Sequence, residues 1–120
     1  MAKIPSEILE LINEFVKSVQ EDNIEIYKVI LYGSYAKGTY NQHSDIDLAI
    51  ISPDFKEGEC VKNAAQLLLK AAKLKADIQT MPFSIEEYQS PLGLMEEILN
   101  NGIEIFNAGI SKQDSALPLT

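Results

Sequence analysis

The sequence predicts one domain of the α/β or α+β class, in which helices pack on a small mixed β-sheet. Its 120 residues are the usual length of a single domain. A hydrophobic fraction of 46% and a charged fraction of 23% are ordinary for a globular chain. Short segments rich in Ile, Val and Tyr alternate with helical patterns, and this interleaving is typical of helices that cover a sheet.

The first half of the predicted domain contains one helix, one helical turn and two strands. In residues 6–20, apolar residues recur at steps of three and four, so they share one face of a helix. Residues 24–32 predict a strand that Gly33 ends, and residues 34–38 predict a short helical turn. After a polar loop, residues 46–52 predict the second strand.

The second half begins with a long helix, predicted over residues 59–75 from its apolar stripe. Residues 76–81 predict a third strand, and Pro82 is expected to stop it because proline cannot donate to a sheet ladder. Ser84 and Glu87 have the spacing of a capping box, which predicts a short helix after that strand.

The last helix is predicted to open at Ser90, which is followed by a proline suited to a first helical turn. That helix is expected to end near Gly102, and residues 103–106 predict the final strand. The order of the predicted helices and strands therefore assigns the domain to residues 1–106. Residues 107–120 are expected to form a flexible C-terminal tail.

Composition narrows the classes of partner. The net charge of −8 opposes binding to long nucleic acids, which normally require a basic surface. No apolar run approaches the length of a membrane-spanning helix, so no membrane partner is expected. The chain has one cysteine, Cys60, which excludes an internal disulfide and suits a reducing, cytoplasmic location.

Two acids stand at the start of the second predicted strand. Strand alternation places Asp45 and Asp47 on the same face, with their α-carbons about 6.6 Å apart. Two unpaired carboxylates this close repel each other, and a divalent cation removes the repulsion. Oxygen ligands of this kind suit Mg²⁺ or Mn²⁺. The alternative for the isolated pair is a solvated strand start without any ligand.

A second group of residues lies where the first predicted strand ends. A strand that enters a helical turn at Gly33 and Ser34 presents free main-chain N–H groups, which bind anions. Glycine lets a phosphate approach the main chain closely. Lys37 adds a positive charge unless it points into solvent, and Gly38 suits the end of a short turn. Alone, this segment is more consistent with an ordinary strand-to-helix turn than with an anion site.

Taken together, the two groups resemble a known signature. Gly33-Ser34, ten intervening residues and Asp45-Ile46-Asp47 resemble the signature of the nucleotidyltransferase superfamily that includes DNA polymerase β and kanamycin nucleotidyltransferase. The small size resembles the minimal nucleotidyltransferases. The resemblance implies the nucleotidyltransferase fold, nucleotide binding by Gly33, Ser34, Lys37 and Ser44, and metal ligation by the two aspartates. Lys37 stands where arginine is common, so a bidentate phosphate contact is lost.

The resemblance also implies a third carboxylate on a later strand. Asp77 is the best candidate, as a third catalytic and metal-binding residue. The alternative is a charge that protects an edge strand from aggregation.

Among the aromatic residues, Tyr32 is interpreted as a core residue, and Tyr35 and Tyr40 as residues at the edge of the site.

The function implied by the resemblance is metal-dependent transfer of a nucleoside monophosphate. Two Mg²⁺ ions would be held by Asp45, Asp47 and Asp77, with ATP or another nucleoside triphosphate as the substrate. Minimal members are often paired with a HEPN-domain toxin, so the acceptor hydroxyl is expected to be a tyrosine of that partner, and this protein would be its antitoxin. The apolar residues of the first helix, or those of residues 92–99, are candidates for the docking face.

Three alternatives stay open. One is a non-catalytic antitoxin that neutralises a partner by binding alone. Another is a nucleotidyltransferase that modifies a small molecule such as an antibiotic. The second alternative requires another subunit to complete the pocket. A homodimer is also open.

Overall fold

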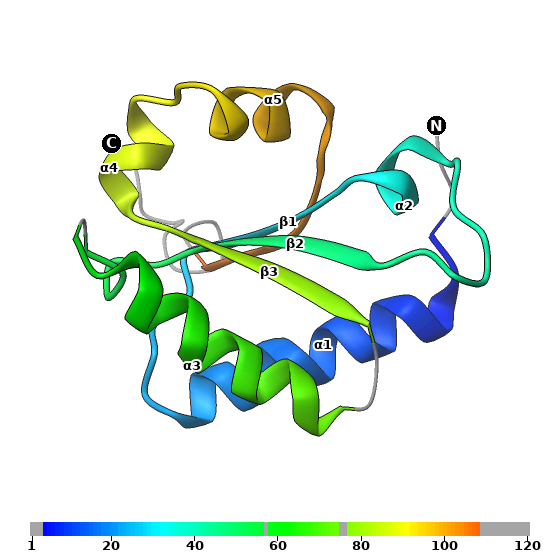
Figure 1. The fold of residues 1–120 in the computed structure, drawn as a ribbon, viewed down its shortest axis with the longest axis horizontal. Coiled ribbons are helices and arrows are strands. Elements are labelled where there is room, and N and C mark those ends of the chain that lie inside the picture. The colour runs from blue at the N-terminus through cyan, green and yellow to red at the C-terminus, as the bar shows by residue number, and fades with distance from the viewer. Residues whose placement is uncertain (1–3, 57, 75–76, 109–120) are drawn as a thin grey trace.

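The computed structural model describes residues 4–56, 58–74 and 77–108. A mixed four-stranded sheet forms its centre, with the strand order β3-β2-β1-β4 (Figure 1). The second strand is antiparallel to the first and parallel to the third, and the fourth strand is antiparallel to the first. The strands are β1 (Lys28–Tyr32), β2 (Ile46–Ile51), β3 (Ile78–Phe83) and β4 (Ile103–Asn107). The predicted fold class is therefore confirmed.

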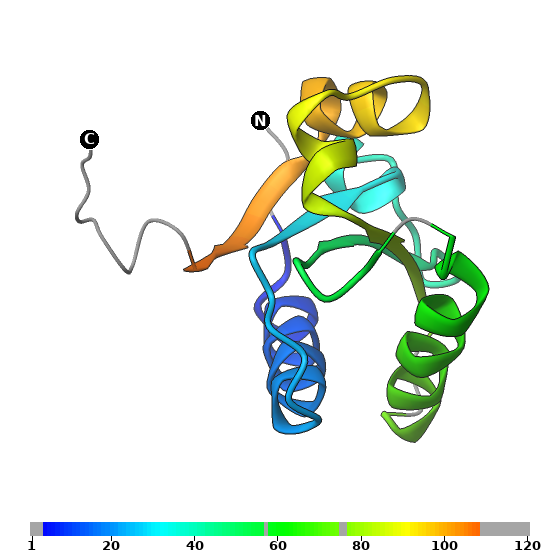
Figure 2. The same cartoon turned by 90° about the vertical axis from the view of Figure 1, so that its left-hand side faces the viewer.

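Helices cover both faces of the sheet, as Figure 2 shows. One face carries the two long helices, and the other carries the two helices that follow β3. A single helical turn, α2, lies at the end of β1. The helices are α1 (Ser6–Glu21), α2 (Ser34–Lys37), α3 (Cys60–Lys73), α4 (Ile85–Gln89) and α5 (Leu94–Asn101).

Alternation along the strands divides the core between the two faces. Leu48 and Ile50 of β2 pack with Phe15 of α1 and Leu67 of α3. The intervening residues, Ala49 and Ile51, face α5 on the other side. β2 is thus apolar on both faces from Leu48 onward, because both faces are covered. Asp47 has the same parity as Ala49, so its side chain lies on the α5 face of the sheet.

Two predicted boundaries were wrong. Pro82 does not stop β3 but lies inside it, opposite Ile50 of β2. β3 is an edge strand, so the nitrogen of Pro82 has no ladder bond to lose on the outer side. Ser90 does not open the last helix: it ends α4, with its N–H donating to the carbonyl of Glu86. α5 begins only after Gly93, whose φ of 58° redirects the chain.

The remaining predicted elements are present, with two strand ends displaced. Ser84 and Glu87 form the expected capping box, with two reciprocal hydrogen bonds of 2.8 and 3.1 Å. The first strand starts at Lys28, later than predicted, and the last strand includes Asn107. The predicted flexible tail lies mostly outside the described residues, as does the predicted start of the third strand at Ala76. Within the described part of the chain, no helix is both long and apolar enough to cross a membrane.

Candidate active site

The turn between β1 and α2 is built around Gly33. Its φ of 76° lies in the region that favours glycine, and it caps the start of α2. The N–H groups of Ala36 and Lys37 both donate to its carbonyl oxygen, at 3.1 Å. The N–H groups of Ser34 and Tyr35 find no acceptor among the described residues, as expected for the first two residues of a helix. These two donors are suited to an anion such as a phosphate.

Asp47 lies directly beside this turn. It pairs with Tyr32 across the β1–β2 ladder, one residue before Gly33. A Cβ atom added to Gly33 would lie 2.2 Å from Oδ2 of Asp47 and 3.1 Å from its Cγ. The carboxylate therefore uses the space that only a glycine leaves open. The two halves of the motif meet in space, as the sequence predicts.

Asp45 and Asp47 influence each other electrostatically. Partial burial, and then the charge of Asp45, raise the pKa of Asp47 above its ordinary value. Burial and the charge of Asp47 likewise raise the pKa of Tyr32. Neither aspartate forms an ion pair with a lysine in the described part of the chain. The site thus holds two neighbouring carboxylates without a protein cation to balance them.

This donor set fits a divalent cation. Carboxylate oxygens are the ligands that Mg²⁺ and Mn²⁺ prefer. A cation at this position would remove the repulsion by Asp45 that, after burial, raises the pKa of Asp47. Asp45 is exposed and Asp47 is half-buried, so both are open to an ion arriving from solvent.

Asp77 reaches the same end of the sheet but does not complete a cluster. The N–H of Ile46 donates to the carbonyl oxygen of Asp77 at 2.8 Å, which places residue 77 beside residue 45 at the starts of two parallel strands. The side chain of Asp77 is exposed. No group of three or more His, Cys, Asp or Glu side chains is arranged to hold a metal within residues 4–56, 58–74 and 77–108. The third-ligand role of Asp77 stays a prediction.

The other two predicted nucleotide-binding residues differ in their surroundings. Ser44 is half-buried, and its hydroxyl accepts a hydrogen bond from the N–H of Asn41 at 2.9 Å, so it holds the loop before β2. Lys37 is exposed at the end of α2. It lines a small cavity of about 110 Å³ together with Tyr32 and Gly33. Their nucleotide-binding roles remain predictions.

Sequence reasoning missed two contributors to the site and misplaced a third. Tyr32 is a half-buried neighbour of Asp47, and its position directly before the Gly33-Ser34 turn was a usable signal. Leu94 of α5 lines the cavity beside Gly33, and no local sequence pattern predicts this tertiary contact. Tyr35, expected at the edge of the site, is instead 7% exposed in the core, where it stacks on Tyr40 at 4.5 Å.

Comparison with solved structures identifies the class of fold. A candidate nucleotidyltransferase from Sulfolobus solfataricus superposes with a TM-score of 0.62 over 99% of both chains, at 18% sequence identity. A toxin–antitoxin structure with AMP-PNP superposes with a TM-score of 0.55, over 82% of this chain and 75% of that one, at 20% identity. The fold is that of the nucleotidyltransferases.

The family follows from the sequence comparisons. Residues 14–110 match the family model described as Polymerase beta, Nucleotidyltransferase. A candidate protein adenylyltransferase of Methanocaldococcus jannaschii is 34% identical over 104 residues, which are 82% of this chain and 99% of that protein. The chain belongs to the polymerase β-type nucleotidyltransferase family, and the predicted resemblance is confirmed.

Proposed function

We propose that this protein transfers AMP from ATP to a tyrosine hydroxyl of a HEPN-domain partner, in a Mg²⁺-dependent reaction that makes it the partner's antitoxin. The observation that carries the proposal is the contact between the Asp47 carboxylate and the Gly33 turn, with Asp45 alongside. One element offers donors for phosphate oxygens, and the next offers ligands for the cations that accompany a triphosphate.

The roles of the residues follow from this geometry. The free N–H groups of Ser34 and Tyr35 would hold the phosphates that leave as pyrophosphate, so that the α-phosphorus faces the acceptor in line. Asp45 and Asp47 would hold the metal, which supplies charge neutralisation and acidifies the acceptor hydroxyl when bound. Asp77, at the adjacent strand start, would serve as a second-metal ligand or as the general base that takes the hydroxyl proton.

A protein acceptor is supported by the names of relatives and by the surface near the site. The matched relative is a candidate protein adenylyltransferase, and one structural neighbour is a toxin–antitoxin assembly with AMP-PNP. Leu92, just before α5, is 84% exposed, and Leu94, the first residue of α5, is 41% exposed and also lines the cavity next to Gly33. A partner that covers these leucines would bring its tyrosine close to the acid pair. The apolar face of α1 packs in the core, so it is a poor alternative as the docking face for the partner.

The test is incorporation of label from ATP labelled at the α-phosphate into the partner protein in the presence of Mg²⁺. The double variant Asp45→Asn with Asp47→Asn is expected to lose transfer by about a thousandfold or more, as expected when metal and charge stabilisation are removed together. A matched variant changes two exposed acids of α1, Glu10→Gln with Glu14→Gln, and is expected to transfer at the normal rate. Undiminished transfer by the aspartate variant would refute the proposed site.

A second candidate function is inhibition of the partner by binding alone. The observation that favours it is that Asp77 does not join the other two aspartates in one three-carboxylate group within the described residues. In that case the partner is inhibited without acquiring label, and the aspartate variant inhibits as well as the original protein.

The same labelling experiment with a panel of small hydroxyl compounds tests the small-molecule alternative, and light scattering of the purified chain tests the homodimer.

A further inference from the structure

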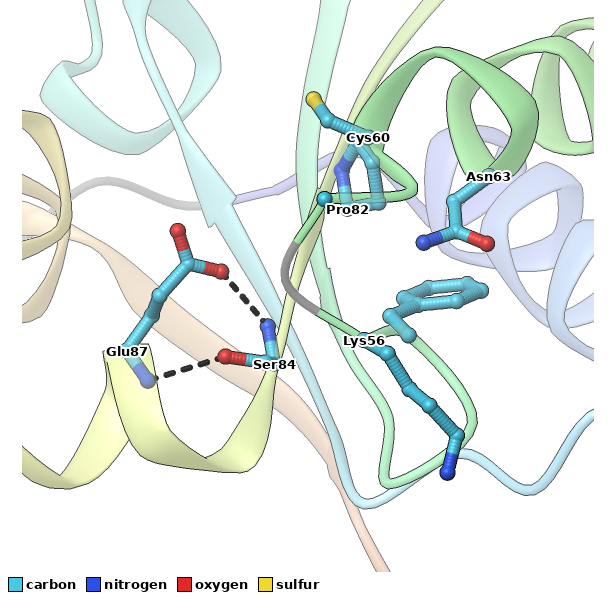
Figure 3. A pocket seen from close by; sticks show the side chains of 8 residues that line it. Lys56, Cys60, Asn63, Pro82, Ser84 and Glu87 are labelled. Carbon is cyan, nitrogen blue, oxygen red and sulfur yellow. Dashed lines mark hydrogen bonds between the residues drawn. The ribbon is translucent and has the colours of Figure 1, made fainter.

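A second pocket lies at the opposite end of the sheet from the aspartate pair. It occupies about 190 Å³ between the connection that follows β2, the first turn of α3, and the junction of β3 with α4 (Figure 3). Ser52, which follows β2, is five residues beyond Asp47, so the pocket is about 17 Å from the candidate active site. The lining residues are Phe55, Lys56, Gly58, Cys60, Asn63, Pro82, Ser84 and Glu87.

The pocket contains a buried amide that has no partner. Asn63 is only 4% exposed, and its main-chain N–H donates to the carbonyl of Glu59. Its side-chain amide makes no hydrogen bond to any described residue. Figure 3 shows this amide extending from α3 into the pocket, on the side that faces Pro82. Buried amides without partners are rare and costly in native proteins, so this one is suited to a ligand.

Ser84 adds a second incompletely used group. It is 2% exposed, and its Oγ accepts a hydrogen bond from the N–H of Glu87 at 3.1 Å. Its own hydroxyl proton has no acceptor among residues 4–56, 58–74 and 77–108. Figure 3 shows the Ser84 hydroxyl on the Glu87 side of the pocket and the Asn63 amide on the α3 side, so a ligand that fills the pocket would meet one of these groups at each side.

The two sides of the pocket have opposite electrostatic character. α3 has no side-chain cap, and the N–H groups of residues 60–62 have no acceptor in the described chain, so this helix start attracts negative charge. Across the pocket, one carboxylate oxygen of Glu87 accepts from the N–H of Ser84 at 2.8 Å, and the other is uncommitted. Figure 3 shows the Lys56 ammonium pointing away from Asn63 and Ser84, so it does not neutralise Glu87.

We propose that this pocket binds a small zwitterion, a free α-amino acid with a short side chain. Its carboxylate would lie at the uncapped start of α3, on the side of the Asn63 amide, and its ammonium group would lie at Glu87. The volume of 190 Å³ holds about six water molecules, which matches the five to eight heavy atoms of the smallest amino acids in order of magnitude. This site is separate from the proposed transferase site and does not depend on it.

Cys60 provides a direct readout, because it is the chain's one cysteine, is exposed, and lines the pocket. Glycine, L-alanine and L-serine, each at about 10 mM, are expected to slow alkylation of Cys60 by iodoacetamide and to shift the Asn63 side-chain amide resonances. Acetate and methylamine each carry only one of the two charges. They are expected to have little effect at the same concentration. Equal effects of amino acids and single-charge compounds, or no resonance shift with any amino acid, would overturn the proposal.

Variants separate the pocket from general surface effects. Glu87→Gln retains the capping box, because glutamine also accepts from the Ser84 N–H, but it removes the charge that pairs with an ammonium group. Affinity for L-serine is expected to fall about tenfold or more, and Asn63→Leu is expected to have a similar effect. Glu86→Gln, an exposed neighbour on the same helix, is the control and should bind normally. Unchanged binding by both pocket variants would also overturn the proposal.

Discussion

The carboxylate of Asp47 occupies the space that a side chain on Gly33 would need: a Cβ atom on Gly33 would lie 2.2 Å from Oδ2 of Asp47. This contact joins the end of β1 to the start of β2, which are adjacent antiparallel strands. It explains why a glycine and an aspartate separated by thirteen residues behave as one motif. The turn at Gly33 and the side chain at position 47 therefore cannot change independently.

The contact predicts a specific cost for a methyl group at position 33. Gly33→Ala combines a collision with Asp47 and a left-handed φ of 76°, so the free energy of unfolding is expected to fall by about 3 kcal/mol. Gly58→Ala is the matched control, because its φ is 89° but nothing lies within 4 Å of its added Cβ. That variant is expected to lose only about 1 kcal/mol. Urea denaturation of both measures the difference, and equal losses would contradict the collision.

The raised pKa of Asp47 gives a prediction for stability against pH without added metal. A carboxyl whose folded pKa lies above its unfolded value of 3.8 stabilises the protein fully below that value. The contribution is lost as pH rises through the folded pKa, so ionised Asp47 destabilises the protein at neutral pH. Asp47→Asn is expected to melt at a higher temperature than the original protein at pH 7 in EDTA. A lower melting temperature for the variant at pH 7 would contradict this electrostatic account.

Added metal is expected to reverse the order of the melting temperatures, so that the original protein melts above Asp47→Asn. A ligand that binds only the folded protein raises its stability by RT ln(1 + [L]/Kd), about 2.7 kcal/mol at a hundred times the Kd. Mg²⁺ or Mn²⁺ should therefore raise the melting temperature of the original protein. The double variant Asp45→Asn with Asp47→Asn should not respond, and an equal ionic strength of NaCl is the control for screening. An equal response of both proteins to Mg²⁺ would place the cation elsewhere.

Local patterns predicted most of the fold because they were reinforced by packing. The apolar stripe of residues 6–20 became α1 with one added residue, and the Ser84–Glu87 capping box formed as expected. Errors arose where tertiary context decides. Pro82 could not be placed inside a strand before β3 was known to be an edge strand. Ser90 had an opening signal for α5, but its N–H closes α4 instead.

The same distinction separates the parts of the candidate site that local sequence places from the parts that it does not. The pairing of Gly33 with Asp47 was predictable because both residues lie at ends of consecutive strands. The contact of α5 with this site was not, since Leu94 reaches the cavity through the tertiary packing of α5 on β1. Tyr35 was misjudged for a related reason: its position in the turn after Gly33 does not fix the direction of its side chain, which packs into the core. The role of Asp77 depends on its side chain, which sequence spacing alone does not orient.

Substitution of Asp77 separates a catalytic role of this residue from a role in protecting the edge strand. If it acts as a metal ligand or general base, Asp77→Asn should lower AMP transfer by about a hundredfold or more. Because its side chain is exposed, the free energy of unfolding should change by less than about 0.5 kcal/mol. If Asp77 only protects the edge strand, transfer should be normal and the variant should aggregate more readily. Transfer rates with labelled ATP, together with light scattering over time, separate these outcomes. Full transfer by Asp77→Asn would assign the proton of the acceptor hydroxyl to another group at this end of the sheet.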